Sequence, residues 1–281
     1  MKALTINPSL VITPILIAGL CLTQFHYDTR RLAHLKSITT PYNELIEPTV
    51  PDVRALRIIS LGHYAVMADL LWLITIQYYG GGDPYGRYRT LPKLVRSINT
   101  LDSRFKYPYE FAGLVLPNEG FPDEALSILK DGEKSLPNEW LLPYYEGTIY
   151  YVNKKDYVSA AESYKQAATK PGAPDKTEFL SAVQFDRSEN YQTALAIFQK
   201  LAEGSENSYF KERAKAFVEH YTLLTELQKV IDLFSEREGR HPHTLNELID
   251  KHYVNEMPAD PLGRELHYDQ ESAKVTADVT K

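Results

Sequence analysis

The chain has 281 residues, which is enough for one or two domains with hydrophobic cores of their own. Charged residues make up 24% of the chain and apolar residues 43%, an ordinary balance for a folded protein that excludes wholesale disorder. The net charge of −6, with no dense run of Lys and Arg, argues against nucleic acid as the main partner.

The N-terminal stretch is the first predicted element. No side chain from Ala3 to Gln24 is charged, and Leu10 to Phe25 is almost wholly apolar. Because about 20 such residues cross a bilayer, residues 1–26 are expected to form a transmembrane anchor with residues 9–25 in the membrane. The alternatives are a buried helix and a cleaved signal peptide, although the bulky Leu20 stands where processing needs a small residue. The only cysteine, Cys21, lies here, so an internal disulfide is impossible.

A proline-containing juxtamembrane linker, residues 27–52, leads to a hydrophobic region, residues 53–104. There, Gly62 divides an apolar stretch into two helices, and a lead-in helix follows. We expect the two helices to form a buried hairpin; the alternatives are a helix on the membrane surface and a second span. Asp69 on this apolar hairpin is expected to be paired by a neighbour, and His63 to start a helix.

A small pattern recurs three times across residues 105–206. Each copy has a small residue, an alanine 12 or 13 positions later and a bulky residue four positions after that, and the first two copies lie 34 residues apart. The pattern predicts pairs of antiparallel helices that cross closely where the small residues meet. The second copy carries one extra residue between its helices. The three sets are Gly113, Ala125 and Leu129; Gly147, Ala160 and Tyr164; and Ala182, Ala194 and Phe198.

This arrangement resembles the tetratricopeptide repeat. The segments Ala68–Leu73, Ile76–Gly80 and Tyr109–Leu116 look like a group of membrane-anchored bacterial proteins with such repeats. The resemblance implies a short solenoid whose first helices line a groove suited to an apolar or extended peptide segment. The alternative is that several of the groove residues merely pack against neighbouring helices. The expected groove residues are Tyr107, Glu110, Leu114, Leu141, Tyr144, Thr148, Tyr151, Lys176, Phe179 and Val183.

A long apolar-faced helix, residues 207–238, is expected to cap the solenoid. The tail, residues 239–281, resembles the major pseudopilins of type II secretion: a short helix, the turn Pro258–Gly263, and a hairpin from residues 265–269 and 274–277. The N-terminal processing motif of that family is absent, so a pilin subunit is not implied. The family's calcium ligands lie after the turn, where only Asp269 and Glu271 are candidates, and no metal is expected.

We therefore expect a mainly α protein: a tetratricopeptide-like solenoid of helical hairpins with an N-terminal transmembrane helix and a small C-terminal β-hairpin. No nucleophile motif, paired carboxylate or cofactor loop is present, so we expect no enzyme and no cofactor. The predicted function is a membrane-anchored scaffold or adaptor that binds a protein or peptide, an assembly factor of the bacterial cell envelope. The positive charges that flank the span favour a cytoplasmic domain, whereas the tail favours the periplasmic side of the inner membrane, which we adopt.

Two other functions compete with this prediction. The chain is alternatively an accessory subunit of a larger membrane complex, with residues 53–79 packed against another membrane protein. The third candidate is an enzyme with an unrecognised site, for which His63 with Asp69, or His241 with His243, are the first residues to consider. The last two flank a proline and are expected to be a solvent-facing lead-in to a helix rather than zinc ligands.

Overall fold

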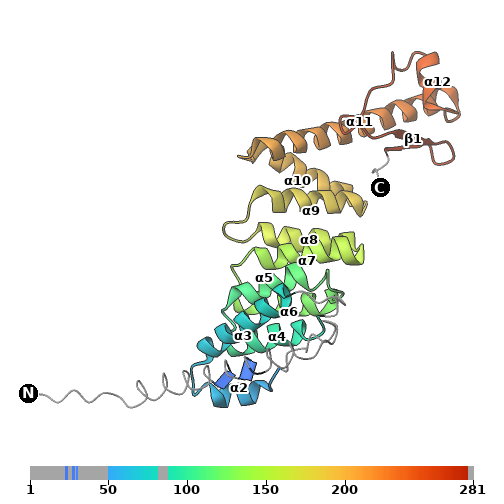
Figure 1. Ribbon diagram of the computed structural model, residues 1–281. Coiled ribbons are helices and arrows are strands. Elements are labelled where there is room, and N and C mark those ends of the chain that lie inside the picture. Colours follow the sequence, from blue (N-terminus) through green and yellow to red (C-terminus); the bar gives the residue numbers. More distant parts are fainter. Residues whose placement is uncertain (1–22, 25–26, 29, 31–49, 82–87, 278–281) are drawn as a thin grey trace, which may run out of the picture. The chain divides into compact units, whose positions relative to one another are not determined.

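A computed structural model describes residues 23–24, 27–28, 30, 50–81 and 88–277. The chain forms two units, and the second, Thr49–Gly82 with Gly86–Lys281, holds all the elements below. This unit is mainly helical with one small antiparallel sheet (Figure 1), which confirms the predicted fold class at that level. Within the described residues, no helix has both the length and the apolar character that a bilayer crossing requires. The predicted anchor lies almost entirely outside those residues.

The first helical pair, α2 (Val53–Ile59) and α3 (Tyr64–Gly80), is separated by Gly62, whose φ of +88° suits glycine. His63 is the N-cap residue of α3, as predicted. One side of α3 packs on α4 (Leu91–Leu101). Many other side chains of the pair are exposed, so the prediction of a buried hairpin is correct for one side only. The shared core comprises Leu56, Ala68, Leu71, Ile98 and Leu101.

Three helical hairpins follow in the predicted places. Their first helices begin at residues 106, 141 and 175 and their second helices at 122, 157 and 191, so both sets repeat after 35 and then 34 residues. Each helix contacts the next one in the chain (Figure 1), and α5 also contacts α7. The hairpins are α5 (Lys106–Val115) with α6 (Pro122–Ser135), α7 (Leu141–Ile149) with α8 (Tyr157–Ala168), and α9 (Asp175–Arg187) with α10 (Tyr191–Gly204).

The extra residue of the second hairpin is absorbed by a π-helical turn. This turn, η1 (Tyr150–Lys154), directly continues α7. A π turn closes its hydrogen bonds over five residues instead of four, and so accommodates one additional residue without unwinding the helix. Lys155 then adopts a left-handed conformation, with φ of 56°, and Asp156 caps the start of α8. The hairpin therefore keeps its packing although its small residue and its alanine lie 13 positions apart instead of 12.

Glycines bring the helices together, but their partners are tyrosines. The sequence predicted that Gly113 faces Ala125 and that Gly147 faces Ala160. The atoms nearest to both glycines instead belong to aromatic side chains, and the Gly113 partner lies in the next hairpin. A Cβ at each position would stand 2.6 Å from Tyr145 Cβ at Gly113, 2.6 Å from Tyr109 Cδ1 at Gly132, and 2.9 Å from Tyr164 Cδ1 at Gly147.

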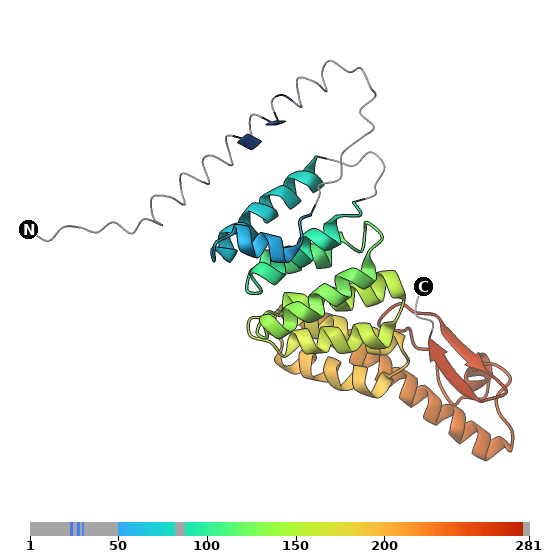
Figure 2. The same cartoon turned by 90° about the horizontal axis from the view of Figure 1, so that it is seen from below.

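The long helix α11 (Ser208–Glu238) belongs to two cores. Its N-terminal half, with Phe217 stacked on Phe198 at 4.0 Å between ring centroids, covers α9 and α10 as the predicted cap. Its C-terminal half packs, through Leu227, Ile231 and Phe234, on the tail. The tail contains α12 (Leu245–Asp250), β1 (Leu266–Asp269) and β2 (Lys274–Ala277), and Figure 2 shows its hairpin beside α11.

The two strands confirm the predicted C-terminal hairpin. They are antiparallel, and Tyr268 is opposite Val275. Gln228 of α11 covers part of the outer edge of β2: its Nε2 donates to the Ala273 carbonyl oxygen at 2.9 Å, and its Oε1 accepts from the Val275 N–H at 3.1 Å. The side-chain amide thus makes the two hydrogen bonds that a neighbouring strand would make.

Buried charges fasten the tail to the last hairpin. Asp186 of α9 accepts hydrogen bonds from Tyr221 Oη and, at 2.9 Å, from Arg264 Nη2. Asp260, whose side chain is fully buried, accepts from the Arg264 N–H at 2.8 Å and pairs with His220 Nδ1. Because each of these carboxylates has several partners, the burial of its charge is compensated. The predicted turn at Pro258–Gly263 is therefore stabilised by the buried side chain of Asp260.

The contact at Gly113 yields the first prediction. Gly113→Ala places a methyl group against Tyr145 Cβ, an atom that side-chain rotation cannot move, so α5 and α7 must separate. We expect a loss of about 2 kcal/mol in the free energy of unfolding, measured by denaturant unfolding of the detergent-solubilised full chain. Gly204→Ala is the control, because no atom lies within 4 Å of a Cβ there; it should be neutral or slightly stabilising. Equal effects of both substitutions would contradict the close approach.

The second prediction concerns the buried charges. Arg264→Leu leaves Asp186 buried without its cation, and we expect a loss of about 3 kcal/mol together with faster hydrogen exchange in residues 258–277. Lys200→Ala removes an exposed ion pair with Glu178 and should change little. Unchanged exchange in the tail of Arg264→Leu would show that these charges do not hold it.

Candidate functional site

The first helices of the three hairpins carry the predicted groove residues, and the structure divides these residues into open and closed positions. On α5, Tyr107 and Leu114 are 57% and 59% exposed. Between them, Glu110 is half-buried and its Oε1 lies 3.3 Å from Lys106 Nζ. An exposed aromatic and an exposed aliphatic side chain on one helix give this end of the predicted groove an apolar contact surface.

On α7, the predicted residues contact the following hairpin. Lys176 Nζ of α9 lies 4.7 Å from the centre of the Tyr144 ring, within the range of a cation–π interaction. The hydroxyl groups of Thr148 and Tyr164 lie 3.0 Å apart. Burial, partly offset by this hydrogen bond, raises the pKa of Tyr164 to about 12. The predicted residues Tyr144 and Lys176 are therefore brought together by the fold.

A second aromatic–cation contact lies seven residues further along the chain from Tyr144, at Tyr151. Arg187 of α9 lies with its guanidinium carbon 5.1 Å from the centre of the Tyr151 ring and 5.9 Å from that of Tyr157, and its Nη1 donates to Tyr151 Oη at 3.4 Å. Its Nε is buried and has no hydrogen-bond partner within the described residues. The sequence analysis missed Arg187, although it follows Val183 by four residues and so continues the same helix face.

The prediction for Phe179 is wrong. This side chain is buried, and its ring contacts those of Phe198, Phe210 and Phe217. Val183 and Leu141 are half-buried, and Val183 packs on the same core. The first helix of the third hairpin therefore presents Lys176 and Arg187, rather than Phe179, beside the tyrosines of the second.

A buried acid lies behind this face. Glu146 precedes Gly147 on α7, is only 5% exposed, and leaves its Oε1 without a hydrogen-bond partner in the described part of the chain. Burial first, and the nearby Glu133 carboxylate second, raise the pKa of Glu146 to about 7; Lys130 and Lys170 oppose the shift. Glu146 follows the buried Leu142 by four residues and precedes the buried Ile149 by three, and this helical spacing was the signal that sequence reasoning could have used.

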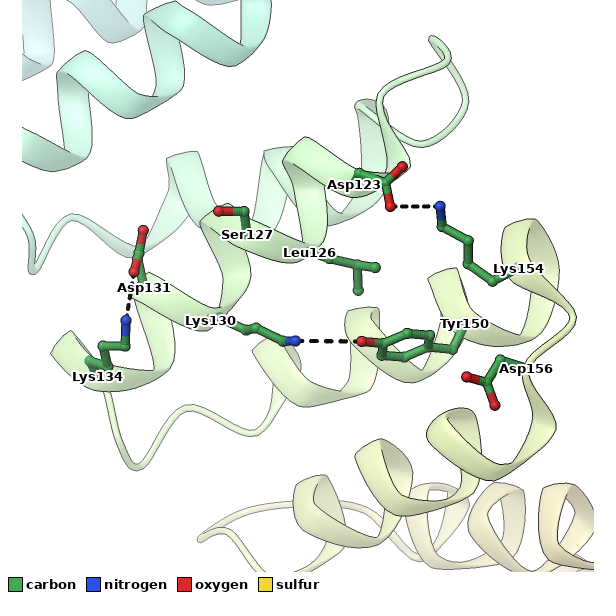
Figure 3. A pocket seen from close by; sticks show the side chains of 9 residues that line it. All are labelled: Asp123, Leu126, Ser127, Lys130, Asp131, Lys134, Tyr150, Lys154 and Asp156. Atoms are coloured by element: carbon green, nitrogen blue, oxygen red, sulfur yellow. Dashed lines mark hydrogen bonds and ion pairs between the residues drawn. The ribbon is translucent and has the colours of Figure 1, made fainter.

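A hollow of about 660 Å³ lies between α6 and the π turn (Figure 3). The charged side chains that line it already have partners within the protein. Lys154 Nζ pairs with Asp123 at 2.6 Å, and Lys134 Nζ pairs with Asp131 at 2.8 Å. Asp156 caps α8, accepting from the Ser159 N–H at 3.0 Å. The hollow is thus a mutually neutralised surface, which favours a structural role over ligand binding.

A second cavity, of about 770 Å³, lies between α11 and β2 and includes His241, Lys229 and Arg264 in its lining. His241 Nδ1 lies 3.0 Å from Ser235 Oγ, and His243 is exposed with its Nδ1 2.9 Å from Gln270 Nε2. Both histidines precede α12, as expected of a lead-in. Across the described ranges, no three His, Cys, Asp or Glu side chains gather as metal ligands would.

The exposed face of α2 and α3 is the largest departure from expectation. Asp69 is exposed there, and no described residue pairs with it, contrary to the prediction. His63 is also exposed. The aliphatic side chains around Asp69 are uncovered as well. The exposed large apolar residues are Ile58, Ile59, Leu61, Tyr64, Val66, Leu70, Leu73, Ile74 and Ile76.

The raised pKa of Glu146 predicts a pH dependence of stability. The folded state binds this proton more tightly than the unfolded state, whose carboxyl has a pKa of 4.5. Stability should therefore fall as pH rises from about 4.5 to about 7 and stay level above that range. The isosteric Glu146→Gln variant should gain up to about 3 kcal/mol over the parent protein at pH 8 and almost nothing at pH 4. Denaturant midpoints between pH 4 and 8 measure this.

The matched control is Glu162→Gln, which neutralises an exposed glutamate on α8. Its curve should stay parallel to that of the parent protein. A Glu146→Gln curve that is equally parallel would mean that Glu146 is ionised at no cost in the folded state.

No family model, curated protein or solved structure matches this chain. The functional interpretation therefore depends on the fold and on the geometry of the surfaces described above.

Proposed function

We propose that this protein is a membrane-anchored helical-repeat scaffold, in which the face formed by α5, α7 and α9 binds an extended segment of another protein. The observation that carries the proposal is the pairing of Tyr144 with Lys176 and of Tyr151 with Arg187, together with the exposed Tyr107 and Leu114 on α5. Rigid aromatic rings supply contact area at a small cost in conformational entropy, and the cations supply recognition of acidic groups.

The resemblance to tetratricopeptide repeats also supports a binding role for the face formed by α5, α7 and α9. The helical hairpins recur after 34 or 35 residues, and small residues lie at their close contacts. Stacked hairpins of this kind present a continuous face made by their first helices. The proposed ligand is a segment with apolar side chains for Tyr107 and Leu114, and with acidic groups for Lys176 and Arg187.

The anchor and the location are part of the proposal. The apolar residues 9–25 would hold the protein in the inner membrane, and the pseudopilin-like order of short helix, Pro258–Gly263 turn and hairpin supports a periplasmic position. An assembly factor of the bacterial cell envelope fits a repeat scaffold that is held at that membrane. The proposal assigns no catalytic step and no cofactor to the chain.

One observation favours a second candidate function. The exposed apolar side of α2 and α3 would suit an accessory subunit that packs on another membrane protein. Such a subunit would keep its partner at fixed stoichiometry when the α5, α7 and α9 face is altered. The scaffold would lose its partner under the same change.

Photo-crosslinking tests the binding face. A photoreactive phenylalanine at Leu114 should give a discrete covalent adduct in cells, whereas the same group at Val158 of α8, which is 57% exposed against 59% for Leu114, should not. Lys176→Glu should abolish the adduct at Leu114 by reversing the charge next to Tyr144. Adducts of equal yield at both positions, or an adduct that is insensitive to Lys176→Glu, would count against this face as the binding site.

A further inference from the structure

The exposed side of α3 is mostly apolar. Apart from Asp69, the 17 residues of α3 carry no charge. Its buried positions, Ala68, Leu71 and Thr75, face α4, and its opposite side presents Val66, Leu70 and Leu73 to the surroundings. A helix that is apolar on all sides is normally covered on all sides. On this helix only one side is covered.

The apolar surface continues onto α2. Ile58 and Ile59 at the end of α2, and Leu61 in the turn, are each more than half exposed. We call these residues, together with the exposed apolar residues of α3, the α2–α3 face; it comprises Ile58, Ile59, Leu61, Tyr64, Val66, Leu70, Leu73, Ile74 and Ile76. So many exposed apolar side chains on two consecutive helices indicate an interaction site.

The composition of the α2–α3 face favours lipid over a soluble protein. Eight of its nine large apolar residues are the aliphatic types Ile, Leu and Val, and Tyr64 is the single aromatic one. The cores of protein interfaces are instead enriched in Tyr, Trp, Phe, Met and Arg. At one end of the face, α2 carries the exposed cations Arg54 and Arg57, a charge that is complementary to phosphate head groups.

The position of the face in the chain points to the same occupant. Residue 25 ends the apolar segment that the proposed function assigns to the membrane, and α2 begins at Val53. A linker of this length reaches at most about 100 Å when fully extended. The α2–α3 face therefore stays within reach of a bilayer that holds residues 9–25.

We infer that the α2–α3 face lies in the surface of the lipid bilayer, with α3 parallel to the membrane plane and its aliphatic side chains among the upper acyl chains. This inference rests on the anchor of the proposed function but not on the peptide-binding face. Helix α3 is packed on α4 along one side, so it lies on the membrane rather than spanning it. Asp69 opposes insertion, which keeps the contact shallow.

Depth-dependent quenching in the full-length chain tests the inference. In a Cys21→Ser background, a single environment-sensitive fluorophore is attached at Leu73→Cys on the face, or at Val152→Cys on the π turn as the matched control, since the two side chains are 56% and 49% exposed. The protein is reconstituted in vesicles of phosphatidylcholine and phosphatidylglycerol that contain lipids with a nitroxide on the upper acyl chain. We expect at least threefold stronger quenching at position 73 than at position 152.

A second variant sharpens the test. Asp69→Leu removes the only charge on α3 and should increase quenching at position 73 further. If the face instead meets a cationic site on a protein, Asp69→Leu would weaken that contact, and lipid quenching at position 73 would equal that at position 152. That equality overturns the inference.

Flotation of the same vesicles separates this result from failure of the anchor. A chain that floats with the vesicles but shows no excess quenching at position 73 has the anchor and lacks the surface contact. A chain that does not float lacks the anchor, and both proposals then fail.

Discussion

The close approach of a glycine to a tyrosine ring is the contact on which the repeat region depends. At Gly113, Gly132 and Gly147 the neighbouring ring lies where even a single methyl group would collide. Because glycine has no side chain, each tyrosine ring packs directly against the backbone of the neighbouring helix. The helices therefore contact each other through an aromatic side chain rather than through two small residues. The excess of tyrosine, 20 residues against 10 phenylalanines, is partly explained, because a tyrosine there fills the gap and keeps a hydroxyl group for hydrogen bonding.

That interlocking also determines what the surface can present. Tyr145 packs on Gly113, and its neighbour Tyr144, whose ring centre lies 5.8 Å from that of Tyr145, meets Lys176. Tyr164, packed against Gly147, reaches Thr148 with its hydroxyl group. The core and the candidate binding face are thus two sides of the same helices. A change at one of the glycines would move the exposed rings as well as loosen the core.

Much of the fold was predictable because it depends on local patterns. The recurrence of small residues gave the helical hairpins, Gly62 gave the break between α2 and α3, and the Pro258–Gly263 turn gave the terminal hairpin. What could not be predicted depends on side chains that meet across the fold. The partner of Gly113 comes from the next hairpin. Phe179 was predicted to line the groove but lies in the core. Arg264 binds Asp186, which lies 78 residues away in the sequence. The exposure of α3 was expected only as an alternative, because an apolar sequence indicates that a surface is to be covered but not by what.

The side chain of Gln228 gives the small sheet a property that its two strands would not have alone. A two-stranded hairpin ordinarily leaves backbone groups open along its rim, and these groups can recruit a strand from another molecule. Here an amide from α11 occupies that rim at Ala273 and Val275. The glutamine therefore makes this edge of β2 a poor template for a strand from a second copy of the chain.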